Sequence, residues 1–182
     1  MKHMRIKLVF AALLALALCL TGLALAEETP ESMVAFPEGM TWSDNVDTIQ
    51  ELVGDAFKEK NESTLVYDVP ADEAFGGLSS FGIVAFDSDN TPLMVTRTFY
   101  NTDDAFYEDV CARIEAICGP DATISSIYLT MMANAYSTDY EKAAGYKAPD
   151  GSVLIAVTGP SWSNNTAITL ISPELVEEAG GF

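Results

Sequence analysis

The sequence has a single histidine, His3, and three of its nine basic residues, Lys2, Arg5 and Lys7, lie beside it. No acid precedes Glu27, so beyond residue 26 the chain has no histidine and six bases against 27 acids, a formal charge of −21 on 156 residues. Without an imidazole, Ser-His-Asp and Cys-His catalysis and histidine ligation of a metal are excluded there. The excess of acid excludes nucleic acid and anionic membranes as partners, because both need a cationic surface.

The sequence has one long apolar run, at 8–26, and this run has the form of an export signal. It follows a short basic stretch and ends in Ala24-Leu25-Ala26, a cleavage pattern. The run approaches the ~20 residues that span a bilayer, so a retained anchor is the alternative, but the break at Gly22 favours cleavage. A lipoprotein signal requires a small residue before its cysteine, but the residue before Cys19 is Leu18. We expect 1–26 to be a signal peptide and the product to be secreted or at the cell surface, without membrane insertion.

Cysteine is scarce beyond the leader, where only Cys111 and Cys118 occur. Export favours a disulfide between them. However, apolar residues at helical spacing predict one helix over about 103–118, and residues seven apart on a helix are separated by ~10.5 Å along its axis. A disulfide needs Cα atoms within ~7 Å, so we expect no disulfide and two buried thiols. The residues that set the helical spacing are Phe106, Val110, Ile114 and Ile117.

The rest of the pattern predicts one α+β domain over 36–182, preceded by a flexible acidic tail at 27–35. A further helix is expected to open at Thr41–Asp44, capped by Ser43 or by Thr41 with Asp44, and to end at Gly54. Alternating residues predict strands, and a turn at 87–90 joins two of them in a hairpin. We expect an antiparallel sheet of about 4–6 strands with helices packed on one face. The strands are expected at 64–69, 80–86, 93–100, 152–157 and 166–171, with a short additional strand at 33–37.

The segment 122–142 has two interpretations. Apolar residues at helical spacing, including Ile124, Ile127 and Met131, favour a third helix, and a strand is the alternative. The choice affects the candidate site, because aromatic residues lie in and just after this segment.

Aromatic residues supply the candidate binding site. Trp162 lies in a loop rich in Pro, Gly, Ser and Asn, and an exposed loop tryptophan is a frequent anchor for a protein partner or a sugar ring. Tyr136, Tyr140 and Tyr146 cluster near two lysines. The alternative for Trp162 is packing over the edge of the sheet. We expect these four residues to contact an unknown protein or carbohydrate ligand.

No catalytic, metal or cofactor site is expected. The sequence contains no G-x-S-x-G, S-x-x-K or Gly-rich nucleotide loop. Asp87, Asp89 and Asn90 resemble the start of a calcium loop, but Pro92 takes the position where that loop requires Gly. The paired acids Asp103-Asp104 and Glu108-Asp109 lie in the first turns of a helix, where the backbone dipole favours acids. Two thiols do not complete a zinc site.

The segment Phe36-Pro37-Glu38-Gly39-Met40-Thr41-Trp42, followed by Val46 and Leu52-Val53-Gly54, resembles the helix opening of small outer-membrane-assembly lipoproteins. It is also similar to β-lactamase-inhibitor-protein-like folds and to uncharacterised secreted proteins of Firmicutes. In those secreted proteins a later helix ends in G-x-P, and Ile114–Pro120 is an approximate match to that ending. The chain departs from these families in lacking a lipobox and a proline after Gly54. The resemblance implies an α+β fold used for binding or scaffolding.

Together these features predict an exported, acidic, non-enzymatic binding or interaction module of unknown ligand. Two alternatives are an inhibitor or modulator of an extracellular enzyme, which the resemblance implies, and a carboxylate-dependent hydrolase. The hydrolase would need two convergent acids ~5 to 9 Å apart.

Overall fold

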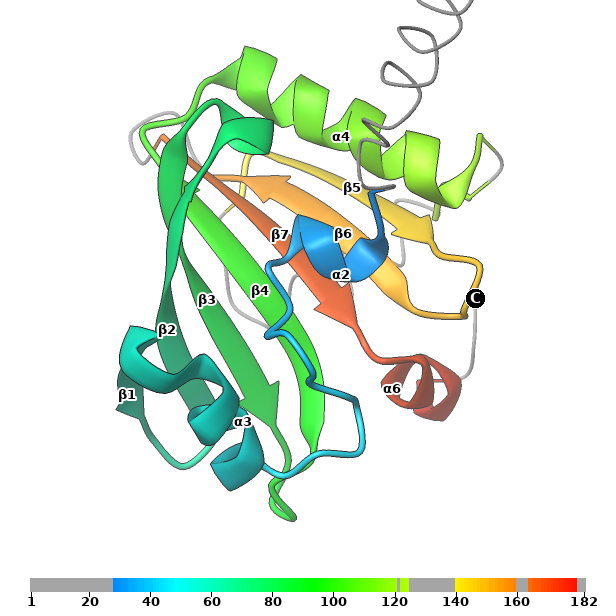
Figure 1. The fold of residues 1–182 in the computed structure, drawn as a ribbon. Helices are drawn as coiled ribbons and strands as arrows, with labels where there is room; N and C mark the ends of the chain where they lie inside the picture. Colours follow the sequence, from blue (N-terminus) through cyan, green and yellow to red (C-terminus); the bar gives the residue numbers. More distant parts are fainter. Residues whose placement is uncertain (1–27, 121, 125–139, 160–163, 180–182) are drawn as a thin grey trace, which may run out of the picture.

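The computed structural model describes residues 28–120, 122–124, 140–159 and 164–179. Seven strands form one antiparallel sheet in the order β1-β2-β3-β4-β7-β6-β5, as Figure 1 shows. The strands are β1 (Phe57–Lys60), β2 (Thr64–Asp72), β3 (Leu78–Phe86), β4 (Pro92–Tyr100), β5 (Lys142–Lys147), β6 (Val153–Thr158) and β7 (Asn165–Ile171). The helices are α2 (Pro30–Met33), α3 (Val46–Val53), α4 (Asp104–Cys118) and α6 (Pro173–Glu178), with 3-10 turns η1 (Gly54–Ala56) and η2 (Glu73–Phe75).

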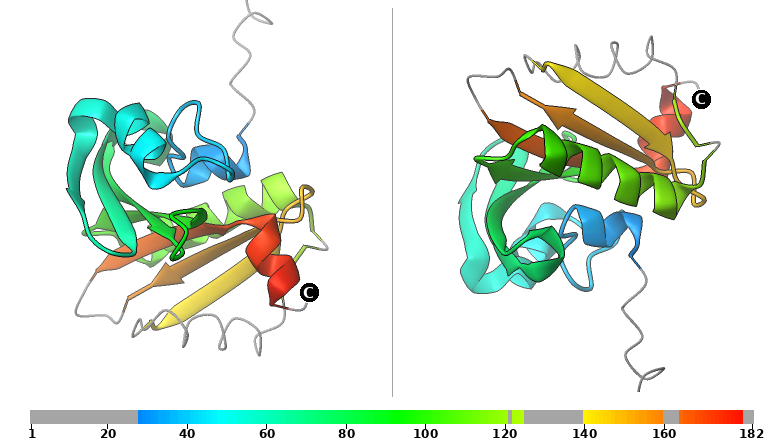
Figure 2. Two further views of the ribbon diagram at one scale, coloured as in Figure 1. Left: turned by 90° about the horizontal axis from the view of Figure 1, so that it is seen from below. Right: turned by 90° about the horizontal axis from the view of Figure 1, so that it is seen from above.

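The sheet is strongly curved, and α2, α3 and α4 lie on its concave side (Figure 2). We call this side the inner face. Alternate residues of the strands point into it, because side chains alternate between the two faces of a sheet. They form one core with the three helices, which buries Met33, Ile49 and Ile114 completely. The strand residues of this core include Leu65, Val84, Val95, Phe99, Leu154, Ile168 and Leu170.

The opposite side of the sheet, which we call the outer face, carries a smaller core. Val176 of α6 packs there with Met94, Val153 and Ile171, and Ile124 joins the same cluster. The expectation of an antiparallel α+β fold is thus confirmed in its coarse form. Its finer terms are corrected: the sheet has seven strands instead of 4–6, and α6 covers the face opposite the other helices.

Two of the expected helices, the one that ends at Gly54 and the one at 103–118, are present to within about three residues at their ends, and so are the five expected strands after residue 60. Their caps differ from the prediction. Asn45 caps α3 by accepting hydrogen bonds from the backbone of Asp47 and Thr48, whereas Asp44 instead accepts one from Thr41. Gly54 ends α3 with a positive φ of 53°, where a glycine is favoured.

Three segments differ from the prediction. In place of a flexible tail at 27–35 and a strand at 33–37, Thr29 caps α2, and Met33 and Val34 are fully buried. The stretch after η1, where no strand was expected, forms the edge strand β1. The helix expected over 122–142 is absent at both of its described ends, because Thr123 forms an isolated bridge with Tyr146 and Lys142 begins β5.

Cys111 and Cys118 both lie on α4, as expected, and both thiols are free, but both residues are half-buried where full burial was expected. Within the part of the chain that the structure describes, no helix is long and apolar enough to cross a membrane.

Candidate binding site on the outer face of the sheet

Tyr146, one of the four aromatic residues expected to bind a ligand, lies in the core. It projects from β5 toward α4 and is 7% exposed. Burial, together with the nearby Cys111 thiol, raises the pKa of Tyr146 to about 12. Burial likewise raises the pKa of the Cys111 thiol. Because Tyr146 is enclosed in this way, its role is structural and it is not available to a ligand.

The other three expected residues do not join it in a described cluster. Tyr140 is half-buried just before β5. Tyr136 and Trp162 lie outside the described residues, so their part of the prediction stays a prediction.

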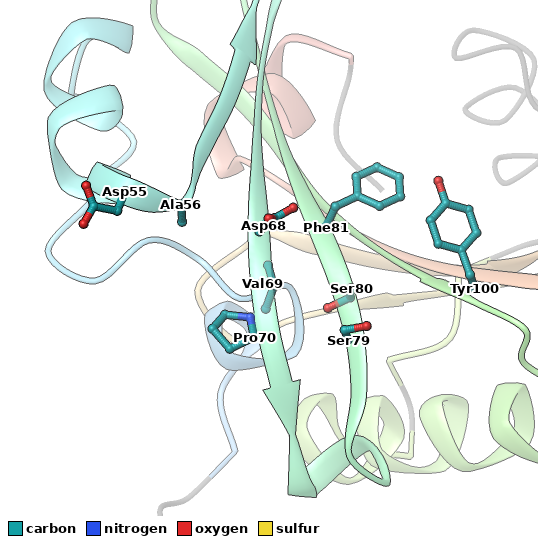
Figure 3. Close-up of a pocket in the computed structure, with 9 residues that line it drawn as sticks. All are labelled: Asp55, Ala56, Asp68, Val69, Pro70, Ser79, Ser80, Phe81 and Tyr100. Carbon is teal, nitrogen blue, oxygen red and sulfur yellow. The ribbon is translucent and has the colours of Figure 1, made fainter.

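The outer face instead carries a hollow of about 650 Å³ between η1 and the end of β4. We call it the outer groove, and Figure 3 shows the residues that line it. Strands β2, β3 and β4 and the turn η1 contribute to it, so most of its wall belongs to the sheet. The lining residues are Asp55, Ala56, Asp68, Val69, Pro70, Ser79, Ser80, Phe81 and Tyr100.

Phe81 and Tyr100 form a stacked aromatic pair in this groove, with ring centroids 5.4 Å apart and planes at 29°. Their neighbourhood follows from the register of β3 and β4, which places Phe81 opposite Thr98, so that Tyr100 is its diagonal neighbour. Tyr100 is 52% exposed and Phe81 is half-buried. The pair therefore presents aromatic surface to the solvent on a rigid element.

The charge of the groove is negative apart from one lysine at its margin. Asp68 lies opposite Phe81 on β2, and its carboxylate is 2.6 Å from Lys58 Nζ. Both side chains of this ion pair are more than half exposed, at 59% and 53%. Asp55 of η1 is exposed. Five ion pairs occur among the described residues: Lys58–Asp68, Lys60–Asp47, Arg97–Asp72, Arg113–Glu28 and Lys142–Asp104.

A buried arginine holds the groove in place from the inner side. Arg97 of β4 is 1% exposed, and its Nε donates a hydrogen bond of 2.8 Å to Ser80 Oγ. Its Nη1 donates to Asp72 at 3.3 Å, and its Nη2 is buried without a partner among the described residues. Burial lowers the pKa of Arg97, while the hydrogen bond and charge of Asp72 oppose that change. Since Ser80 lies between Ser79 and Phe81, Arg97 fixes the strand from which the groove is built.

Aromatic rings complete the environment of Arg97. Its guanidinium carbon lies 4.4 Å from the ring centre of Phe75 and 4.7 Å from that of Phe99. Arg113 of α4 lies 4.0 Å from the same Phe75 ring and also pairs with Glu28. Cations over aromatic faces stabilise by about 0.5–2 kcal/mol each, more when water is excluded. This inner cluster ties α4, η2 and the N-terminal segment together and is structural.

A second hollow, of about 460 Å³, lies at the start of α4. Two of its three acids have partners, because Asp103 caps α4 through the backbone N–H of Phe106 and Asp104 pairs with Lys142 at 2.8 Å, and the third acid is Glu141. Asp103 and Asp104 are among the acids that the sequence pattern assigned to the first turns of the helix, and the structure places Asp103 at the N-cap. In the described residues no group of three or more His, Cys, Asp or Glu side chains is placed to hold a metal ion.

Sequence reasoning missed Phe81 and Tyr100 as candidates. Each one occupies an alternating strand, where an aromatic residue is ordinary. The available signal was that Phe81 and Tyr100 share a side-chain parity opposite to that of the buried residues Val84 and Phe99. No protein family, curated protein or solved structure matches the chain in comparisons with each.

Proposed function

We propose that this chain is an exported, non-enzymatic binding protein that holds its ligand in the outer groove. The observation that carries the proposal is the stacked and solvent-exposed pair Phe81–Tyr100 in a hollow of about 650 Å³. Exposed aromatic residues on rigid strands lose little conformational entropy on binding and provide large contact areas. The pattern at 1–26 supports export, and cleavage after Ala26 would start the chain at Glu27.

The absence of histidine from 27–182 supports binding over catalysis. The two carboxylates of the groove support it as well. Asp68 is paired with Lys58 and well exposed, and Asp55 is exposed, so neither lies in the apolar enclosure that makes a carboxyl group a general acid. A hydrolase with these acids is therefore the weaker proposal.

Binding is tested with substitutions that remove one ring at a time. Wild type, Tyr100→Ser and Phe81→Leu are screened by biolayer interferometry against immobilised neutral oligosaccharides and against peptides of different charge. Leu52→Ala is the matched control, because Leu52 is 41% exposed on α3 and lies outside the groove. We expect a ligand whose affinity falls at least about tenfold in both groove variants and is unchanged in the control. Circular dichroism establishes that each variant is folded.

A ligand that binds equally well to all four proteins would contradict the proposal. Cleavage of the leader is tested separately by intact-mass analysis of secreted protein. A mass that begins at Glu27 supports cleavage after Ala26, and a retained leader or a lipid-modified Cys19 would refute that cleavage.

A further inference from the structure

We propose that the outer groove recognises an arginine side chain carried by an extended segment of a partner protein. This inference rests on the proposed function and specifies its ligand class. In the proposed arrangement the guanidinium group lies over the Phe81–Tyr100 pair and binds the Asp68 carboxylate in place of Lys58.

The overall charge of the chain selects a cationic ligand. Only six bases occur in 27–182, and five of them are already bound to carboxylates of the same chain. The 27 acids therefore far outnumber the cations that balance them, and the field at the surface attracts positive charge and repels anions. A partner with basic side chains approaches this surface faster than a neutral one.

The groove has a cation position that a ligand can take over. Lys58 and Asp68 are both more than half exposed, so their ion pair contributes little to stability and is readily exchanged. A guanidinium group binds a carboxylate through two parallel hydrogen bonds, which an ammonium group does not. An incoming arginine therefore competes well with Lys58, whose amine then returns to water.

The aromatic pair favours the same ligand group. In the inner cluster this protein already places guanidinium groups over aromatic rings, with Arg97 4.4 Å and Arg113 4.0 Å from the centre of Phe75. Among the described residues no basic side chain lies over Phe81 or Tyr100. A planar guanidinium stacks on such a face, which makes arginine a better fit than lysine.

The size of the groove indicates a segment and not a single ion. Beyond the aromatic pair it offers apolar contacts from Ala56 and Pro70 and a hydroxyl group from Ser79, all within the same hollow. An extended peptide crossing the groove contacts these residues while its arginine occupies the anionic and aromatic end. A small polycation would leave them uncovered.

The test uses NMR titration of the ¹⁵N-labelled protein, which detects weak binding and maps it. The probe is the peptide Ac-Ser-Ala-Arg-Ala-Ser-NH₂, and its matched control carries citrulline, a neutral isostere, in place of arginine. We expect shifts at Asp68, Ser79, Phe81 and Tyr100 with the arginine peptide and at least about tenfold weaker binding of the citrulline peptide. Tyr100→Ser should weaken the arginine peptide by at least about 5-fold.

Two lysine variants separate a built site from general attraction. Lys58→Ala and Lys60→Ala remove the same charge from the same strand, but only Lys58 pairs with Asp68, since Lys60 pairs with Asp47. We expect Lys58→Ala to strengthen peptide binding about 2- to 5-fold relative to Lys60→Ala. Equal effects of the two substitutions would overturn the exchange of Lys58 for the ligand.

Other outcomes show which of the two proposals is wrong. Equal binding of the citrulline peptide, or Tyr100-dependent binding of a neutral oligosaccharide alone, would overturn the arginine inference and leave the proposed function standing. If spermidine binds the same residues as tightly as the peptide, the ligand is a small polycation and the inference of a protein segment is wrong. Shifts scattered over the acidic surface and unchanged in Tyr100→Ser would refute the inference, and a groove that responds to no probe would refute both proposals.

Discussion

Tyr67 and Gly82 are directly opposite partners on β2 and β3, and the ring of Tyr67 occupies the space where a Cβ of residue 82 would lie. An ideal Cβ built on Gly82 would be 2.1 Å from Tyr67 Cζ. The Tyr67 hydroxyl group extends further and donates a hydrogen bond of 2.8 Å to the carbonyl oxygen of Ala35. The glycine thus allows one tyrosine to cross the inner face and hold the N-terminal segment.

Gly82→Ala should therefore reduce the free energy of unfolding by at least about 2 kcal/mol, because the added methyl group forces the Tyr67 ring out of its place. Urea denaturation measures the change. In a Tyr67→Leu background the same substitution should cost clearly less, since the smaller side chain leaves room. Additive costs in the double variant would mean that the Tyr67 ring is not what restricts residue 82.

Met33→Ala should cost about 2–5 kcal/mol of unfolding free energy, because Met33 is completely buried in the inner core. Glu38→Ala is the control, and as an exposed position it should change stability by less than about 0.5 kcal/mol. Equal, small effects at both positions would show that the N-terminal segment is not part of the folded domain.

The N-terminal segment also shows where sequence reasoning stopped. Thr29 and Pro30 are a good cap and first residue for a helix, but α2 has only four residues and no apolar period to recognise. In β1 only Phe57 is even half-buried, so no alternation marks it as a strand. β5 contains Ala143 and Ala144, which favour helix locally, and pairing with β6 decides its structure.

Longer elements were predictable because their signals are repeated. The stripe on α4 and the alternation in β3 and β4 predicted these elements to within about three residues. The groove was not predictable, because Phe81 and Tyr100 meet only through the register of two strands. Sequence gives the side-chain parity, but register and curvature depend on the assembled sheet.

Asp72→Asn should destabilise the protein by about 1–3 kcal/mol, because it leaves the buried guanidinium group of Arg97 without its carboxylate. The loss is moderated by the 38% exposure of the Asp72 side chain. Arg97→Met in the Asp72→Asn background should recover part of the stability, since the unpaired charge is then removed. A thermodynamic cycle from chemical denaturation measures the coupling, and its absence would show that the two residues act independently.

The two thiols predict a loss of stability at alkaline pH. Burial raises the pKa of Cys118 from 9.0 to about 11, and it also raises that of Cys111. Between pH 9 and 11 the unfolded chain has released the Cys118 proton and the folded chain has kept it, so the folded state binds more protons and stability falls as pH rises. Below pH 9 this contribution is constant.

Unfolding free energies measured from pH 8 to 10.5 should therefore fall for wild type and fall less steeply for Cys118→Ala. The same burial should make Cys118 react with iodoacetamide at pH 8 about 100-fold more slowly than a free cysteine. Rapid alkylation of Cys118 in the native protein would contradict the raised pKa of its thiol.

The strand order divides the sheet into two meanders, β1–β4 and β5–β7, joined by the pairing of β4 with β7. Each meander is made of pairs that are near in sequence, whereas Thr96 and Thr169, whose hydroxyl groups are 3.0 Å apart across the junction, are separated by 73 residues. Closing such a long loop has a high entropic cost before any contact forms. We therefore expect the docking of the two halves to limit folding, and the edges of β4 and β7 to be the surfaces on which newly made chains pair wrongly with one another.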